Sequence, residues 1–267
     1  MGIIGAVSGA LVVGSFAANP AVRLRTDLGV IDLVLYQDVA PATVVNFLGY
    51  VNRGDYDNSF FHRSLVNFII QGGGWKVVNN AIAQIPLQAA VVNEFNVSNT
   101  RGTIAMAKVA GNPNSATNQW FFNTANNASN LDAQNGGFTV FGAVMDASSL
   151  TTMDVIAAVP VFNWNTTFPQ IPLKNFTSGV VQDANLVHVI SVKVIPELEI
   201  SRLVTGDVEL KVTGAPSTVY QVQSSTTLLA GSFTPFVTVT TNAAGVVTSS
   251  DAVTGAVPQK FYRLVLP

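Results

Sequence analysis

Residues 60–74 read FFHRSLVNFIIQGGG, an apolar stretch that contains one arginine and closes with three glycines. A guanidinium in apolar surroundings is unfavourable by several kcal/mol unless it is paired or reaches a wet pocket. The stretch predicts two short strands around a turn, and period-2 alternation places Phe61 and Arg63 on one face. Ile69 and Gln71 reach the same face after the turn. Arg63 is therefore either the polar centre of a site or an edge residue whose charge reaches solvent.

The segments around this stretch predict a mainly β fold with two helices. Residues 41–54 form an amphipathic pattern that a proline opens and a glycine closes, which predicts a helix, and residues 149–159 predict a second one. Residues 21–37 alternate on both sides of a turn, as in a β-hairpin. Further strands are predicted within 102–110, 119–125, 137–144 and 187–195. Because closure removes exposed strand edges, this set predicts an antiparallel β-barrel capped by two helices.

After Pro196 the pattern changes to strand-length runs between turn residues, with no helical signal. Such a pattern predicts a small β-sandwich joined by a short linker. We therefore expect an apolar N-terminal segment at 1–18, a first domain at 19–197 and an all-β module at 198–267. The aromatic residues of the module are interpreted as core rather than as a ligand-binding shelf: Tyr220, Phe233, Phe236, Phe261 and Tyr262.

The composition excludes several classes of function. Charged residues make up 10% of the 267 residues, against about 25% in typical soluble domains, and the formal net charge is −2. This balance argues against nucleic acid and anionic membranes as partners. The absence of cysteine excludes disulfides and thiolate catalysis, and no metal-binding or phosphate-binding motif occurs, so no cofactor is predicted. Both histidines, His62 and His188, are interpreted as structural.

The N-terminal segment leaves two interpretations open. The first 22 residues carry no charge, and residues 3–18 are apolar or small, which is shorter than the roughly 20 residues of a membrane span. The sequence SFA before Ala18 has the small-x-small pattern of an export cleavage site, although the usual basic region is missing. The segment is either an export signal or an apolar strand of the mature protein, and we favour the export signal. Low charge also fits an exported protein, whether periplasmic, extracellular or held at the cell surface.

Five stretches, in order along residues 20–196, resemble cyclophilin-type peptidyl-prolyl isomerases, most of all the periplasmic bacterial branch. They are APATVVNFLGYVNRGDYDNSFFHR (40–63), FHRSLVNFIIQGG (61–73), NEFNVSNTRGTIAMAK (93–108), NQWFFNTANN (118–127) and NLDAQNGGFTVFG (130–142). The resemblance implies an eight-stranded antiparallel β-barrel capped by two helices, with an active groove on its outer face.

The resemblance also implies roles for individual residues. Arg63 matches the catalytic arginine, and Gln71 matches the glutamine that holds it. The implied substrate-binding residues are Phe68, Ile69, Ala107, Lys108, Gln119, Phe121, Leu131 and Phe138. Asn130 stands where the eukaryotic pattern has a tryptophan, and Phe138 where that pattern has a histidine. Cyclosporin binding, which depends on that tryptophan, is therefore in doubt.

The reaction that the resemblance implies explains why an arginine stands among apolar residues. Rotation about an X-Pro bond needs no nucleophile, metal or cofactor, only groups that favour the twisted amide. We therefore expect a foldase that acts on proline-containing polypeptides of exported or surface proteins. The alternative is a binding or structural protein that grips proline-containing segments with little turnover. Contact of the C-terminal module with the cell surface or an extracellular assembly remains open.

Overall fold

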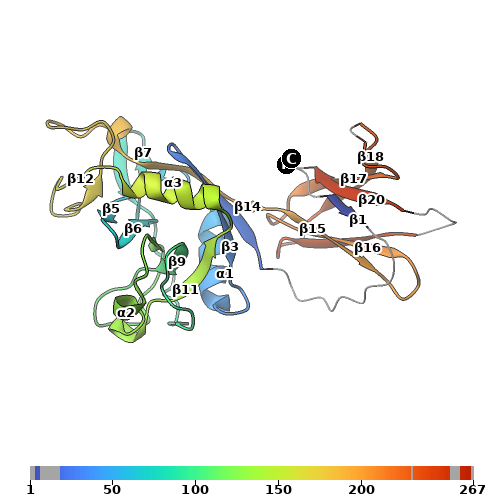
Figure 1. The fold of residues 1–267 in the computed structure, drawn as a ribbon, viewed down its shortest axis with the longest axis horizontal. Coiled ribbons are helices and arrows are strands. Elements are labelled where there is room, and N and C mark those ends of the chain that lie inside the picture. The colour runs from blue at the N-terminus through green and yellow to red at the C-terminus, as the bar shows by residue number, and fades with distance from the viewer. Residues whose placement is uncertain (1–3, 7–18, 230, 253–258, 266–267) are drawn as a thin grey trace. The chain divides into compact units, whose positions relative to one another are not determined.

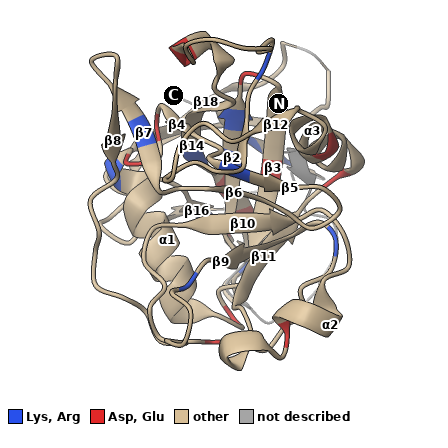
Figure 2. Cartoon of the chain, turned by 90° about the vertical axis from the view of Figure 1, so that its left-hand side faces the viewer, with Lys and Arg blue, Asp and Glu red and all other residues tan. Residues whose placement is uncertain are grey.

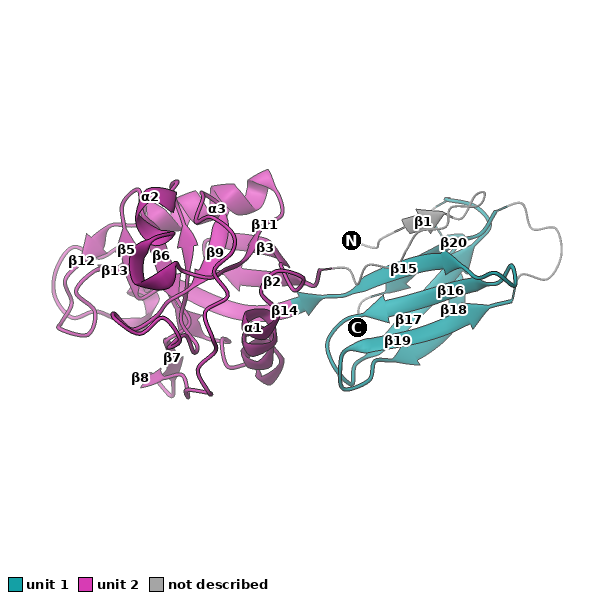
Figure 3. Ribbon diagram, turned by 90° about the horizontal axis from the view of Figure 1, so that it is seen from below, with its two compact units in different colours: residues 1–18, 194–267 teal, residues 19–193 magenta. Residues whose placement is uncertain are grey.

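The computed structural model describes residues 4–6, 19–229, 231–252 and 259–265 (Figure 1). The chain divides into two compact units, one made of residues 19–193 and the other of residues 1–18 with 194–267 (Figure 3). None of the helices in the described ranges has the length and apolarity needed to cross a membrane.

The unit of residues 19–193 is built on one antiparallel sheet that follows the order β5-β6-β10-β9-β11-β3-β2-β14-β4-β7-β8. Its strands are β2 (Ala21–Thr26), β3 (Gly29–Leu35), β4 (Ser59–Phe60), β5 (Arg63–Leu65), β6 (Ile69–Gly72), β7 (Trp75–Val78), β8 (Ala81–Gln84), β9 (Thr103–Met106), β10 (Trp120–Asn123), β11 (Val140–Val144) and β14 (His188–Ile195). A separate short hairpin joins β12 (Val161–Phe162) to β13 (Ile171–Pro172).

The sheet closes through one bent segment. β4 pairs with β14 while β5, two residues later, pairs with β6 at the opposite end of the order. The N–H of Phe61 donates to the carbonyl of Val187 and that of His62 to the carbonyl of Gln71, both at 3.0 Å. Counting β4 and β5 as one strand gives a ring of eight among the described strands, which confirms the predicted barrel.

Two helices pack on the barrel as the apolar spacing predicts. α1 (Pro41–Arg53) begins at its proline and ends before Gly54, which has a φ of 70°. α3 (Ala147–Ala157) begins after Asp146, whose side chain accepts a hydrogen bond from the N–H of Ser149. Three short helical turns were not predicted: α2 (Ala128–Leu131), η1 (Gln134–Gly136) and η2 (Asp183–Asn185).

The prediction that Phe61 and Arg63 share one face is wrong. Phe61 is fully buried and packs edge-on against Trp120, with ring centroids 5.6 Å apart. Trp120 and Phe121 are neighbours in β10 and therefore point to opposite faces, so Phe61 lies on the core side. The bend between β4 and β5 interrupts the period of two, and Arg63 faces away from the core that Phe61 enters.

The other unit contains two antiparallel sheets around one apolar core, which is the predicted sandwich. One sheet comprises β15 (Glu197–Arg202), β16 (Val208–Thr213) and β19 (Val246–Asp251). The other comprises β1 (Ile4–Ala6), β20 (Phe261–Val265), β17 (Val219–Ser225) and β18 (Thr234–Thr240). Tyr220 and Tyr262 are buried in the shared core, and Phe236 packs against it. Of the predicted export signal only residues 4–6 are described, and the rest lies outside the described residues.

His62 gives the unit of residues 19–193 a stability that depends on pH. Its ring is buried and its Nδ1 has no hydrogen-bond partner among the described residues. Burial lowers the pKa of His62 from 6.5 to about 4, because the charged ring would lose its hydration. The unfolded chain therefore takes up a proton that the folded chain excludes, between about pH 6.5 and pH 4.

We predict that His62 makes the protein about 2 kcal/mol less stable at pH 5 than at pH 7, since stability falls as the pH drops through this window. Urea unfolding of the parent and of His62→Gln at both pH values measures the difference. The glutamine variant lacks the titrating ring and should show a correspondingly smaller loss. Equal pH dependence in the two proteins would contradict a buried neutral His62.

Candidate active site

A pocket of about 210 Å³ opens on the outer face of the barrel, on the side of β10 away from Trp120. This volume is below the roughly 300–1,000 Å³ of pockets that enclose drug-sized ligands, and it suits one small ring or side chain. Its lining residues are Arg63, Phe68, Ile69, Gln71, Ala107, Lys108, Phe121, Leu131, Gln134 and Phe138. Nine of the ten predicted site residues lie here, and the tenth, Gln119, adjoins the pocket through Gln71.

Strand pairing explains how the polar residues meet. β5 and β6 form a hairpin in which Arg63 lies opposite Gln71, and the turn between them contains Asn67 with a φ of 54°. In the next pair of strands Gln71 lies opposite Phe121. Residues directly opposite in an antiparallel pair share a face, so these three side chains form a row across the sheet.

The glycines at the end of β6 allow a close approach to β10. Gly73 has a φ of 82°, and a Cβ at this position would lie 2.4 Å from the carbonyl oxygen of Asn118. A Cβ on Gly72 would lie 2.8 Å from the Trp120 ring. The backbone beside the pocket is therefore possible only without side chains at these positions.

Arg63 is held by two uncharged acceptors. Its Nη1 donates to Gln71 Oε1 at 3.3 Å, and its Nε donates to Gln170 Oε1 at 3.0 Å. Gln71 in turn donates through Nε2 to Gln119 Oε1 at 2.8 Å. Burial lowers the pKa of Arg63, and none of the described carboxylates contributes to the shift. The guanidinium remains protonated, and within the described ranges no carboxylate forms an ion pair with it.

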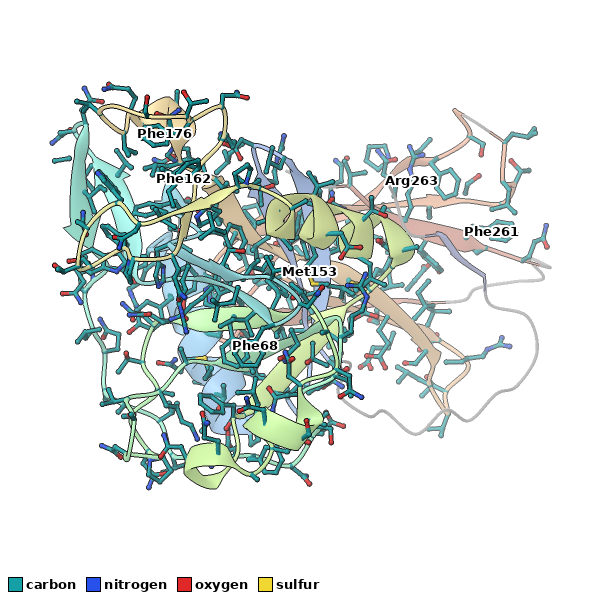
Figure 4. All side chains as sticks on the ribbon, turned by 60° about the vertical axis from the view of Figure 1, so that its left-hand side comes forward. Phe68, Met153, Phe162, Phe176, Phe261 and Arg263 are labelled. Carbon is teal, nitrogen blue, oxygen red and sulfur yellow. The ribbon has the colours of Figure 1, made fainter. Side chains whose placement is uncertain are left out.

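Apolar side chains form the wall beside this charge. Phe121 is buried and meets Phe138 edge-on, with centroids 5.7 Å apart. Phe68, labelled in Figure 4, is partly buried and packs against the same cluster. Lys108 Nζ donates to the carbonyl of Asn135 at 2.9 Å and lies 4.8 Å from the centre of the Phe138 ring. The Lys108 ammonium therefore packs against the Phe138 ring. Burial lowers the pKa of Lys108.

A chain of buried amides holds the two sides of the pocket together, and sequence reasoning missed it. Asn127 donates to the carbonyl of Phe68 at 2.7 Å and to Asn123 Oδ1 at 2.7 Å. Asn123 donates to Asn99 Oδ1 at 3.2 Å, and Asn99 donates to the carbonyl of Phe138 at 3.0 Å. The carbonyls at both sides are therefore fixed by one network. In an Asn-rich sequence no spacing singles out these three.

Gln134 and Gln170 were also missed. Gln134 belongs to the short turn η1, which has no periodicity. Gln170 comes from the irregular segment between α3 and β14. Gln170 is 107 residues from Arg63 in sequence. Nothing in the local pattern of a proline-rich loop connects the two.

Comparison with known proteins identifies the family. A peptidyl-prolyl cis-trans isomerase of Acinetobacter baylyi is 38% identical over 173 residues, which cover 63% of this chain and 89% of the relative. Peptidyl-prolyl cis-trans isomerase B of Escherichia coli is 39% identical over 141 residues, which cover 51% and 80%. A cyclophilin structure from Cryptosporidium parvum matches with a TM-score of 0.49 and 20% identity, over 66% of this chain and 97% of that one.

The family model for cyclophilin type peptidyl-prolyl cis-trans isomerases matches residues 21–178, which is more than half of the chain. These residues contain all ten predicted site residues and the ring of the barrel except β14. The chain therefore belongs to the cyclophilin-type peptidyl-prolyl cis-trans isomerases.

Proposed function

We propose that this isomerase acts without a covalent intermediate, through the stabilisation of a twisted X-Pro amide by Arg63. The observation that carries the proposal is the un-neutralised guanidinium beside an apolar pocket of about 210 Å³. Such a pocket accepts a proline ring, and proline-containing polypeptides are accordingly the substrates. Phe68, Phe121 and Leu131 would contact the ring.

The energetics favour an arginine in this role. An X-Pro bond crosses a barrier of about 18–20 kcal/mol, because twisting it destroys the amide resonance. The nitrogen lone pair becomes a hydrogen-bond acceptor only as the bond twists, so a donor aimed at it binds the transition state better than the planar amide. A preorganised donor in a site that excludes water contributes about 3 kcal/mol, or roughly a hundredfold in rate.

Gln71 would hold the guanidinium in line with the bond. The hydrogen bonds to Gln71 and Gln170 use two of the five N–H donors that a guanidinium offers. The remaining donors are then available to the substrate nitrogen and its neighbouring carbonyl. Gln119 supports Gln71 from the far side.

We predict that Arg63→Ala lowers kcat at least about tenfold in a protease-coupled assay with an Ala-Pro peptide, while peptide affinity changes less. The apolar wall remains in this variant, so it still binds the proline ring. Arg25→Ala removes an exposed arginine from β2 and serves as the matched control with parental activity. Equal turnover by Arg63→Ala and the parent would contradict a catalytic role of Arg63, and a parallel loss of turnover and affinity would contradict a role confined to the twisted state.

We further propose that the protein is exported and that the C-terminal module contacts the cell surface or an extracellular assembly. The uncharged first 22 residues and the 10% content of charged residues support export. In Figure 2 the segments coloured for Lys, Arg, Asp and Glu are few and lie scattered along the chain. The loop between β17 and β18 exposes Leu228 by 58% and Leu229 by 71%, which supports a contact role for the module.

Fractionation of bacterial cells that express the full chain, or a chain ending at residue 197, tests both proposals. We expect both proteins outside the cytoplasm, with the full chain bound to the surface and the shortened chain released. Recovery of the full chain in the cytoplasm would contradict export. The same distribution for both chains outside the cytoplasm would contradict contact through the module.

A further inference from the structure

The Arg63 guanidinium depends on a residue from a distant loop. Gln170 stands immediately before β13, and its backbone carbonyl accepts a hydrogen bond from the N–H of Ser64 at 2.8 Å. The backbone of the loop is therefore docked onto β5 one residue from Arg63. Gln170 Oε1 then accepts from Arg63 Nε at 3.0 Å, which is shorter than the 3.3 Å bond from Nη1 to Gln71.

The loop that carries Gln170 is fixed by aromatic packing. Phe168 is 4% exposed and lies edge-on to Trp75 and Phe60, with centroid distances of 5.3 and 5.8 Å. The Trp164 ring stacks on the Phe168 ring with centroids 5.5 Å apart, and the backbone N–H of Trp164 donates to the Phe168 carbonyl at 3.1 Å. The glutamine is thus held on one side by a buried phenylalanine and on the other by β13.

The β12–β13 hairpin, which adjoins Gln170, is also held by apolar packing. Phe162 in β12 meets Phe176 edge-on at 5.0 Å, and Figure 4 shows the two side chains at the same end of the unit. Phe162 also lies opposite Ile171, the buried residue that follows Gln170. Both strands of the hairpin are therefore anchored in one apolar cluster, which fixes the backbone of Gln170 beside β5.

The chemistry of the acceptor matters as much as its position. An amide oxygen orients the guanidinium without cancelling its charge, whereas a carboxylate at the same place would form an ion pair and weaken donation to a ligand. We propose that Gln170 is a positioning residue of the isomerase, which aims the Arg63 guanidinium into the groove through an uncharged acceptor. This inference rests on the proposed role of Arg63 in the twisted state.

The first test removes the acceptor. In Gln170→Ala the guanidinium keeps only the longer bond to Gln71, so we expect kcat for an Ala-Pro peptide to fall about tenfold through lost orientation. KM should stay within about threefold, because the apolar wall is intact. Thr166→Ala, an exposed change in the same loop, should match the parent in both constants. A parental kcat in Gln170→Ala would overturn the proposal.

The second test keeps the hydrogen bond and adds a charge. Gln170→Glu has nearly the same shape and still accepts from Arg63 Nε, so a residue that only held the loop in place would tolerate it. We expect its kcat to fall at least about tenfold with a melting temperature no lower than that of the parent, because the new carboxylate pairs with the guanidinium. Parental kcat in this variant would overturn the proposal even if Gln170→Ala failed to fold.

A direct readout follows the Arg63 Nε–H signal by nuclear magnetic resonance, assigned by its absence in Arg63→Ala. We expect slow exchange with solvent in the parent and at least about fivefold faster exchange in Gln170→Asn, whose shorter side chain cannot reach Nε. Unchanged exchange would overturn the contact. Full activity of Arg63→Ala would refute the proposed function itself, whereas an impaired Arg63→Ala beside fully active Gln170 variants would refute only the role of Gln170.

Discussion

The central constraint of this molecule is a positive charge that must be held still without being neutralised. Arg63 satisfies this constraint through two glutamine oxygens, at 3.0 and 3.3 Å, and no described carboxylate acts on it. Uncharged acceptors fix the direction of the N–H donors and leave the electrostatic attraction for the substrate. Partial burial of an arginine is unfavourable unless its N–H groups are hydrogen-bonded, and here the two glutamine oxygens accept from it.

The position of Arg63 is tied to the closure of the barrel. Arg63 lies at the point where β4 bends into β5, the segment that closes the ring of strands. The bend turns Phe61 into the core against Trp120 and leaves Arg63 on the outer face. Closure of the barrel and exposure of the guanidinium are therefore consequences of the same local geometry, and the sharp glycine turn after Gln71 preserves the close contact with β10.

The sequence predicted the parts that depend on short-range pattern or on the resemblance. The hairpin, the two long helices and the barrel followed from periodicity and turn residues, and the matched motifs named nine of the ten residues that line the pocket. The failures have physical causes. Phe61 was misplaced because a bend resets the alternation, and Gln170 was missed because its partner lies 107 residues away. The amides of Asn99, Asn123 and Asn127 resemble any others until the fold joins them.

The proposal that the oriented Arg63 guanidinium accelerates the isomerisation is tested most directly on the bound substrate. Exchange spectroscopy by nuclear magnetic resonance, with an Ala-Pro peptide at saturating protein, measures the cis–trans rate on the parent and on Arg63→Lys. A lysine keeps the charge but lacks the planar set of donors that two glutamines can orient. We expect exchange on Arg63→Lys to be at least about tenfold slower than on the parent, with peptide affinity within about threefold. An unchanged rate on the lysine variant would contradict it.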